Sequence, residues 1–309
     1  MKLFLGISFT ITVILVSIYF LFPQVPFKFY VAIERRSSGL TEKKTEIKDH
    51  TIYYLEGGEK NPETIICVHG LGADKDNFTW FAKFLTGKYH VIIPDLPGNG
   101  ESTRNANMRY DIMSQVQRLD LIVNRLGLKR FHLVGSSMGG GIAGVYSALY
   151  PEKVLSLALF NAAEVRAPVE SEREKIIRTT GKNPLLTYSI DDFERSFSFN
   201  FVKTPKIPSA IKKYLAKQEV KKFAEIESDY NFEFGNKLYT LEKYLPEIKA
   251  RTFILWGDTD NLTHVSSVEV LKKKIKYSEA VIMPQSGHGA FAERPEEAAG
   301  HYLKFLEGK

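Results

Sequence analysis

A serine flanked by glycines is the pattern with the clearest chemical meaning in this sequence. Residues 135–139 read Gly-Ser-Ser-Met-Gly, and they lie between an apolar run at 131–134 and a helical stretch at 142–149. Glycines two positions on either side let a strand and a helix pack closely, while Ser137 takes a strained turn that exposes its hydroxyl. Larger residues at either glycine would clash. A glycine-rich turn without chemistry is the alternative, and the wider sequence decides between them.

A serine hydroxyl becomes a good nucleophile only when a histidine accepts its proton and a carboxylate orients that histidine. His288 stands between two glycines on the last loop before a C-terminal helical stretch. Residues 257–260 read Gly-Asp-Thr-Asp and follow a buried-strand pattern at 252–256. The chain order is therefore Ser, Asp, His, as at a serine nucleophile elbow. Either Asp258 or Asp260 could supply the carboxylate, because one turn presents both.

Two backbone N–H groups are expected to bind the negative oxygen that forms during acyl transfer. Residues 68–72 read Val-His-Gly-Leu-Gly and close an earlier strand, where such a donor is usually placed. We predict the amides of Leu71 and Met138 as the donors. Their side chains would then be free to line the acyl site. His69 is interpreted as structural.

The N-terminus predicts a membrane anchor. Residues 3–22 are apolar apart from four hydroxyl residues, and about 20 such residues cross a bilayer. The segment at 21–27 is bulky and contains two prolines, which disfavours signal peptidase cleavage. We therefore expect a single-pass membrane protein whose anchor spans residues 1–24. The flanking charges leave open which side the catalytic part faces.

The rest of the chain alternates short apolar runs with helical stretches, which is typical of a mainly parallel sheet covered on both faces. We expect a linker at 25–44, a first core part at 45–163, a helical cap at 164–248 and a second core part at 249–309. An antiparallel pair is expected at 45–56. The expected buried strands are 65–68, 91–94, 131–134, 154–160, 252–256 and 280–283.

Aromatic residues are frequent in the expected cap, and some of them could line a tunnel for an acyl chain. Others are expected to pack the cap onto the core. They are Tyr188, Phe193, Phe197, Phe199, Phe201, Tyr214, Phe223, Phe232 and Phe234.

Composition excludes several other classes of protein. Cys67 is the only cysteine, so no disulfide can form within the chain, and its apolar neighbours indicate a buried thiol. The seven histidines lack the clustered spacing of a metal site, and we expect no metal and no cofactor. The net charge of +6 comes from scattered lysines, and no nucleic-acid-binding motif is present. The sequence does not indicate an oligomeric state.

Beyond the serine motif, three short segments carry a resemblance to the α/β-hydrolase superfamily. These are His-Gly at 69–70, Asp-Leu-Pro-Gly-Asn-Gly at 95–100, and Trp-Gly-Asp-Thr-Asp at 256–260. The last resembles the superfamily's Trp-Gly-x-x-Asp turn, which implies that Asp260 is the acid. Some members place the acid after the sixth strand, where Glu164 would be the candidate.

Within the superfamily, the chain looks most like membrane-anchored monoacylglycerol lipases and bacterial lipases, which residues 75–79 and 183–186 resemble. The resemblance implies an α/β-hydrolase fold: a mostly parallel central sheet flanked by helices, with an inserted helical cap and an N-terminal transmembrane helix. It also implies a serine hydrolase that cleaves acylglycerol esters. Ser137, Asp260 and His288 would be catalytic.

Three other functions are compatible with parts of the sequence. Residues 139–144 formally match the Gly-x-Gly-x-x-Gly motif of dinucleotide-binding enzymes, but Gly135 already occupies the end of the strand. Carbon–carbon bond hydrolases share the serine motif, although a membrane anchor has little use for their small polar substrates. A non-catalytic binding protein of the same fold is disfavoured by the complete set of Ser, Asp and His.

Overall fold

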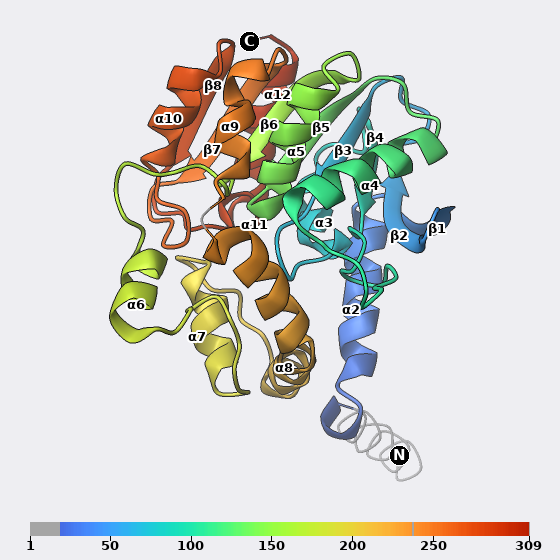
Figure 1. Ribbon diagram of the computed structural model, residues 1–309. Coiled ribbons are helices and arrows are strands. Elements are labelled where there is room, and N and C mark those ends of the chain that lie inside the picture. The colour runs from blue at the N-terminus through green and yellow to red at the C-terminus, as the bar shows by residue number, and fades with distance from the viewer. Residues whose placement is uncertain (1–18, 237, 309) are drawn as a thin grey trace, which may run out of the picture.

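The fold is built on an eight-stranded sheet (Figure 1). The computed structural model describes residues 19–236 and 238–308. Only β2 runs against the other strands: it is antiparallel to both of its neighbours, β1 and β4, and it forms with β1 the antiparallel pair expected at 45–56. Along the sheet the strands follow the order β1-β2-β4-β3-β5-β6-β7-β8. Five of the six predicted buried strands are confirmed; β8, at the edge of the sheet, is only partly buried, and its Glu279 and Ile282 are exposed. The strands are β1 Thr41–Ile47, β2 His50–Gly57, β3 Thr64–Val68, β4 His90–Pro94, β5 Phe131–Ser136, β6 Val154–Phe160, β7 Arg251–Gly257 and β8 Ser278–Met283.

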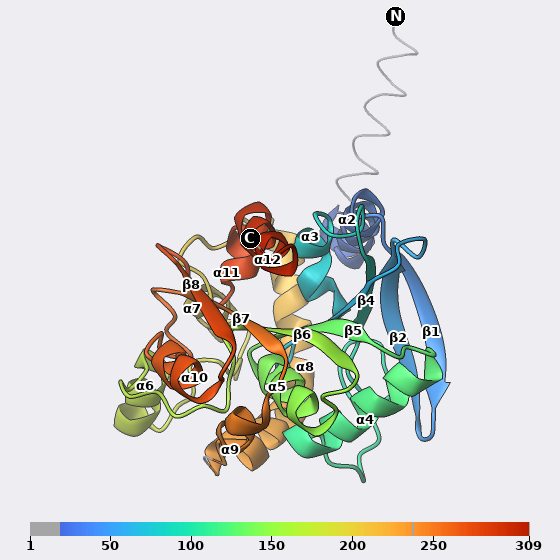
Figure 2. The ribbon, with the colours of Figure 1, turned by 90° about the horizontal axis from the view of Figure 1, so that it is seen from above.

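Helices cover both faces of the sheet, which is why its strands read as continuous apolar runs. In β3, Ile65 and Cys67 pack on one face while Ile66 and Val68 pack on the other. The Cys67 thiol is fully buried, as predicted, and its burial raises its pKa. Figure 2 shows the two layers. One contains α4 Ile112–Arg125, α5 Met138–Leu149, α9 Thr240–Tyr244 and α10 Ser267–Lys274; the other contains α3 Thr79–Ala82, α11 Ala290–Glu293 and α12 Pro295–Leu306.

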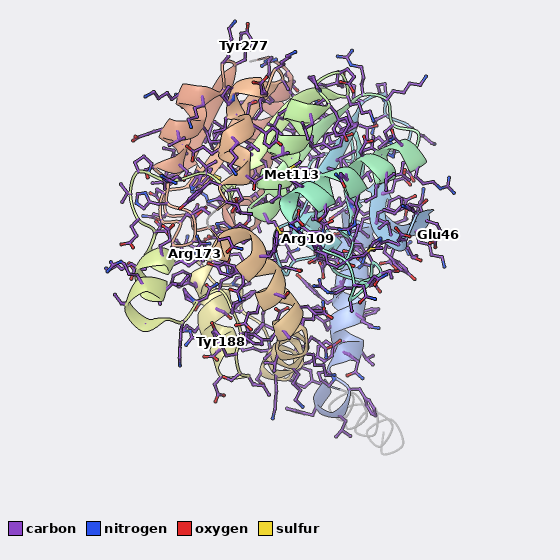
Figure 3. All side chains as sticks on the ribbon, viewed as in Figure 1. Glu46, Arg109, Met113, Arg173, Tyr188 and Tyr277 are labelled. Carbon is purple, nitrogen blue, oxygen red and sulfur yellow. The ribbon has the colours of Figure 1, made fainter. Side chains whose placement is uncertain are left out.

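The segment between β6 and β7 is helical, in agreement with the expected cap at 164–248. Its longer helices lie together beyond the carboxyl ends of the parallel strands (Figure 1). Tyr188, labelled in Figure 3, lies in this region, and its ring centroid is 5.0 Å from that of Phe223. The cap thus has aromatic packing of its own. Its elements are α6 Glu172–Thr180, α7 Asp192–Phe199, α8 Ser209–Tyr230, η2 Asn231–Gly235, α9 and η3 Leu245–Glu247.

The segment expected as a linker at 25–44 is mostly ordered secondary structure. Helix α2 spans Gln24–Ser37, and β1 begins at Thr41. Arg35 of α2 donates to both carboxylate oxygens of Asp76 at 2.6 Å, and the indole of Trp80 donates to Glu34 at 3.1 Å. These side-chain hydrogen bonds hold α2 on the core. They could not be predicted from the local sequence, because their partners lie about 40 residues further along the chain.

Most of the predicted anchor, residues 1–24, lies outside the described residues. Among residues 19–236 and 238–308, no helix combines the length and the apolar character needed to span a bilayer. Large apolar side chains nevertheless face solvent at residues 20–22 and in α2. They are Phe20, Leu21, Phe22, Val25, Phe29, Tyr30 and Ile33, each at least 46% exposed.

Candidate active site

Ser137 lies at the sharp turn between β5 and α5. Its φ of 55° and ψ of −122° are a conformation that non-glycine residues rarely adopt. A β carbon on Gly135 would lie 2.1 Å from the carbonyl oxygen of Gly139, and one on Gly139 would lie 2.1 Å from that of Val68. The predicted need for glycine at both positions is therefore confirmed. The strained turn is held by close backbone packing.

Helix α5 begins directly after this serine. We expected a helix only from residue 142, because three consecutive glycines are poor helix formers. In the structure α5 starts at Met138, so residues 139–144 lie inside a helix. They therefore do not form the loop that a dinucleotide motif requires.

The loop after β3 approaches Ser137 closely. A β carbon built on Gly70 would lie 3.0 Å from the Cβ of Ser137. Among the described residues, the backbone N–H groups of Leu71 and Met138 have no backbone acceptor. The side chain of Leu71 lines the cavity in front of Ser137, as expected. That of Met138 instead packs in the core, because the first turn of α5 points it toward the sheet.

His69 holds this loop in place and is not exposed to solvent. Its Nε2 accepts a hydrogen bond from the backbone N–H of Leu96 at 3.0 Å, and its Nδ1 lies 2.8 Å from the carbonyl oxygen of Gly70. Burial lowers the pKa of His69. A neutral imidazole can donate from Nδ1 while it accepts at Nε2. These contacts support the prediction that His69 has a structural role.

A buried ion pair supports the same loop from behind. The backbone N–H of Lys75 donates to Asp95 at 2.7 Å, and its ammonium donates to the other oxygen of that carboxylate at 2.8 Å. The ammonium also donates to Glu101 at 2.5 Å. Both segments resemble the family in sequence, but no local pattern pairs residues that are 20 positions apart.

Asp260 and His288 lie side by side beneath the cap. The Nδ1 of His288 is 2.9 Å from Oδ2 of Asp260, whose side chain is completely buried. The hydroxyl of Thr263 donates to the same oxygen at 2.7 Å, and the backbone N–H groups of Leu262 and Thr263 donate to Oδ1. Burial raises the pKa of Asp260, but His288 and the Thr263 hydrogen bonds outweigh it, so the pKa is lowered overall. The carboxylate is therefore held ionised beside the imidazole.

The two alternative carboxylates lie elsewhere. Asp258 is exposed and accepts hydrogen bonds from the hydroxyl of Thr259 at 2.7 Å and from the backbone N–H of Ser286 at 3.4 Å. Glu164 is buried and accepts a hydrogen bond from the backbone N–H of Thr240 at 2.7 Å. The structure thus pairs His288 with Asp260 and gives Asp258 and Glu164 roles in turns.

The end of β6 connects the serine turn to the acid loop. The backbone N–H of Ser137 donates to Phe160 at 3.0 Å, and that of Ala163 donates to the carbonyl of Ser137 at 2.9 Å. Between them, the side-chain amide of Asn161 donates to Asp260 at 2.6 Å. The sequence alone did not predict that Asn161 and Thr263 contact Asp260. The position of Asn161 directly after a predicted buried strand was the one available signal.

Ser137 and His288 line the same cavity, which has a volume of about 360 Å³. No hydrogen bond joins their side chains within the described chain. Such bonds often tighten only when a substrate is bound. The cap contributes an apolar wall to this cavity, and four of the predicted cap aromatics are part of it. The apolar cap side chains in this wall are Leu185, Leu186, Phe193, Phe197, Phe201, Leu215, Phe223 and Ile226.

A second cavity of about 680 Å³ lies on the other side of Leu262, which contributes to both walls. Arg173 of α6, labelled in Figure 3, is part of its lining. Neither Ser137 nor His288 belongs to this wall. Within residues 19–236 and 238–308, no three His, Cys, Asp or Glu side chains are grouped so that they could hold a metal ion.

Comparison with known proteins identifies the family. Residues 63–295 match a family described as alpha/beta hydrolase fold. The chain belongs to the α/β-hydrolase family. Over 279 residues it is 33% identical to Lipase 1 of Psychrobacter immobilis, covering 89% of this chain and 87% of that protein. It is 30% identical to the monoacylglycerol lipase abhd6-B of Xenopus laevis, covering 93% and 88% of the two chains.

A solved structure extends this agreement. The crystal structure of a membrane phospholipase A, described as a bacterial virulence factor, superposes with a TM-score of 0.90. It is 40% identical and covers 100% of this chain and 99% of its own. The resemblance to monoacylglycerol lipases and bacterial lipases is confirmed. The predicted enzyme class, a carboxylic ester hydrolase, agrees with the names of these relatives.

Proposed function

We propose that this α/β-hydrolase cleaves the carboxylic ester of a monoacyl lipid, of the monoacylglycerol type, through an acyl-enzyme on Ser137. The observation that carries the proposal is the Asp260–His288 pair, which shares an apolar cavity with a serine held in a strained turn. His288 takes the proton of Ser137 as its oxygen attacks the ester carbonyl. Asp260 stabilises the imidazolium, and the amides of Leu71 and Met138 bind the oxyanion. The alcohol leaves, and water then releases the acid.

The proposal is tested by hydrolysis assays on a panel that runs from monoacylglycerols of graded acyl length to short aryl esters. We expect Ser137→Ala to lower kcat by at least about 10⁴-fold on every substrate of the panel. Ser136→Ala is the matched control, since Ser136 is the neighbouring buried serine of the same motif. Full activity in Ser137→Ala would refute the assignment of the nucleophile. Activity confined to short soluble esters would refute the lipid substrate.

Phospholipids are a second candidate substrate. The solved structure with 40% identity is named as a phospholipase A, and it matches this chain over its full length. The same acyl-enzyme chemistry would release a fatty acid from a glycerophospholipid. Adding phosphatidylglycerol and its lyso form to the panel compares the two substrate classes directly.

We also propose that residues 3–22 stay attached as a single-pass membrane anchor. Their apolar sequence supports this, as do the exposed aromatic side chains that follow them in the N-terminal helix. After cell disruption, the full chain should sediment with membranes and resist extraction by high salt. A variant that lacks residues 1–22 should be released into the soluble fraction; membrane retention of this variant would contradict the proposal.

A further inference from the structure

One carboxyl group lies in the wall of the catalytic cavity. Apart from His288, Glu219 is the only ionisable residue among the described residues that line it. The rest of the wall is apolar, except for a few hydroxyl and amide side chains. Glu219 is partly buried in this wall, and an ionised carboxylate that faces an apolar surface without a partner loses part of its hydration. A carboxylate elsewhere on α8 would stay hydrated. The position of Glu219 in the wall therefore suggests that it binds part of a ligand.

The geometry of α8 places this carboxyl group near the loop after β3, which contains Leu71 and Gly72. Leu215, Glu219, Phe223 and Ile226 all line the cavity, at helical spacings of four, four and three residues. Ile226 lies over Gly72, since a β carbon there would be 3.3 Å from its Cδ1. Glu219 lies two helical turns earlier, about 10 Å along the axis. It therefore belongs to the face of the cap that covers the serine site.

The charges around Glu219 are unbalanced. Within residues 19–236 and 238–308 its carboxyl group has no hydrogen bond and no ion pair. Burial, together with the negative charge of Asp74, raises its pKa, and Lys222 opposes this shift only in part. Burial also raises the pKa of Asp74 to about 6. A bound group that donates hydrogen bonds would satisfy Glu219, whereas an anion there would be repelled by Glu219 and by the nearby charge of Asp74.

We propose that Glu219 determines headgroup specificity: it accepts hydrogen bonds from hydroxyl groups of the substrate's alcohol and disfavours substrates that carry an anionic group beside the ester. The inference rests on the proposed function, because it assigns the alcohol part of a lipid ester to this wall. Of the two candidate substrate classes, monoacylglycerols and phospholipids, this inference favours the neutral monoacylglycerols. Glu219 is a binding residue here and has no part in proton transfer.

The test uses three esters of one fatty acid, which differ only in the alcohol. Monoacylglycerol offers two hydroxyl donors, the methyl ester offers none, and 1-acylglycerol 3-phosphate adds a negative charge. The full chain in detergent micelles is assayed as wild type, Glu219→Leu, Glu219→Gln and Glu227→Gln. Glu227 is the matched control, because it is on the same helix but outside the cavity wall. Circular dichroism checks that each variant is folded.

We expect Glu219→Leu to lower kcat/KM for monoacylglycerol by about tenfold to hundredfold, the usual effect of losing hydrogen bonds to a charged group. The methyl ester should change by less than about twofold. Both Glu219 variants should raise kcat/KM for the phosphate substrate, because each removes the charge. Glu219→Gln keeps the size of the side chain and should lose less on monoacylglycerol.

Two results would overturn the inference alone. One is an equal fall on monoacylglycerol and the methyl ester, which would mean that Glu219 only supports the cap. The other is an unchanged ratio between the three substrates in all variants while hydrolysis still depends on Ser137. If the wild type cleaves none of the three esters, both this inference and the proposed function fail.

Discussion

Replacing Lys75 with methionine should destabilise the fold strongly, because it would leave Asp95 charged and buried without a counter-ion. The side chains of Lys75 and Asp95 are 2% and 0% exposed. Removing one partner of such a pair typically costs about 3–5 kcal/mol. We expect a value near the lower limit, about 3 kcal/mol, since the backbone N–H groups of Lys75 and Glu101 still donate to Asp95. For a chain of this length the midpoint of thermal unfolding should fall by about 5 °C.

Urea unfolding of the full chain in detergent measures this loss. Lys88→Met is the matched control, because Lys88 is 62% exposed and its contact with Glu307 is 3.4 Å long. It should change the free energy of unfolding by less than about 0.5 kcal/mol. The double variant Lys75→Met with Asp95→Asn removes both charges and should recover only part of the loss, because the amide of Asn can accept from only one of the two backbone N–H groups that donate to Asp95. The reasoning is refuted if Lys75→Met costs no more than Lys88→Met.

Two further predictions concern the residues that we propose to be catalytic. Ser137→Gly should be inactive yet more stable to urea than Ser137→Ala by about 1 kcal/mol, because glycine adopts a φ of 55° without the strain that alanine retains; equal stability would argue against strain at this turn. Since the pKa of Asp260 is depressed in the folded state, its ionisation contributes stability above its unfolded pKa of about 3.9, and this is lost as pH falls through the folded pKa. Asp260→Asn should therefore show a smaller loss of unfolding free energy than the wild type between pH 5 and pH 3, and parallel pH curves would contradict the pairing with His288.

Much of the core could be predicted because its signals are local. Each buried strand is a short apolar run, and the turn at Ser137 needs glycine at two fixed positions. The order of the serine, acid and histidine loops follows from the order of these strands. Choosing Asp260 over Asp258 needed a family resemblance, since both carboxylates lie in one turn and only the three-dimensional structure shows which one faces His288.

What the sequence did not reveal depends on contacts between distant segments. Lys75 and Asp95 resemble ordinary surface charges until β3 and β4 are placed side by side. The segment at 25–44 was expected as a linker, because the side chains that hold α2 on the core, such as Asp76, lie far along the chain. In the cap, the helices themselves were expected, but no periodicity indicates which of their residues face the cavity, so Glu219 went unnoticed.

The hydrogen bonds at the end of β6 have a consequence for how this enzyme could diversify. Ala163 and Asn161 fix the serine turn and the acid loop to each other just before the chain leaves the core to form the cap. Ser137 and Asp260 are thus positioned by residues outside the inserted segment. The cap could be lengthened, shortened or exchanged for that of a relative, and the substrate range would change while the chemistry was inherited intact.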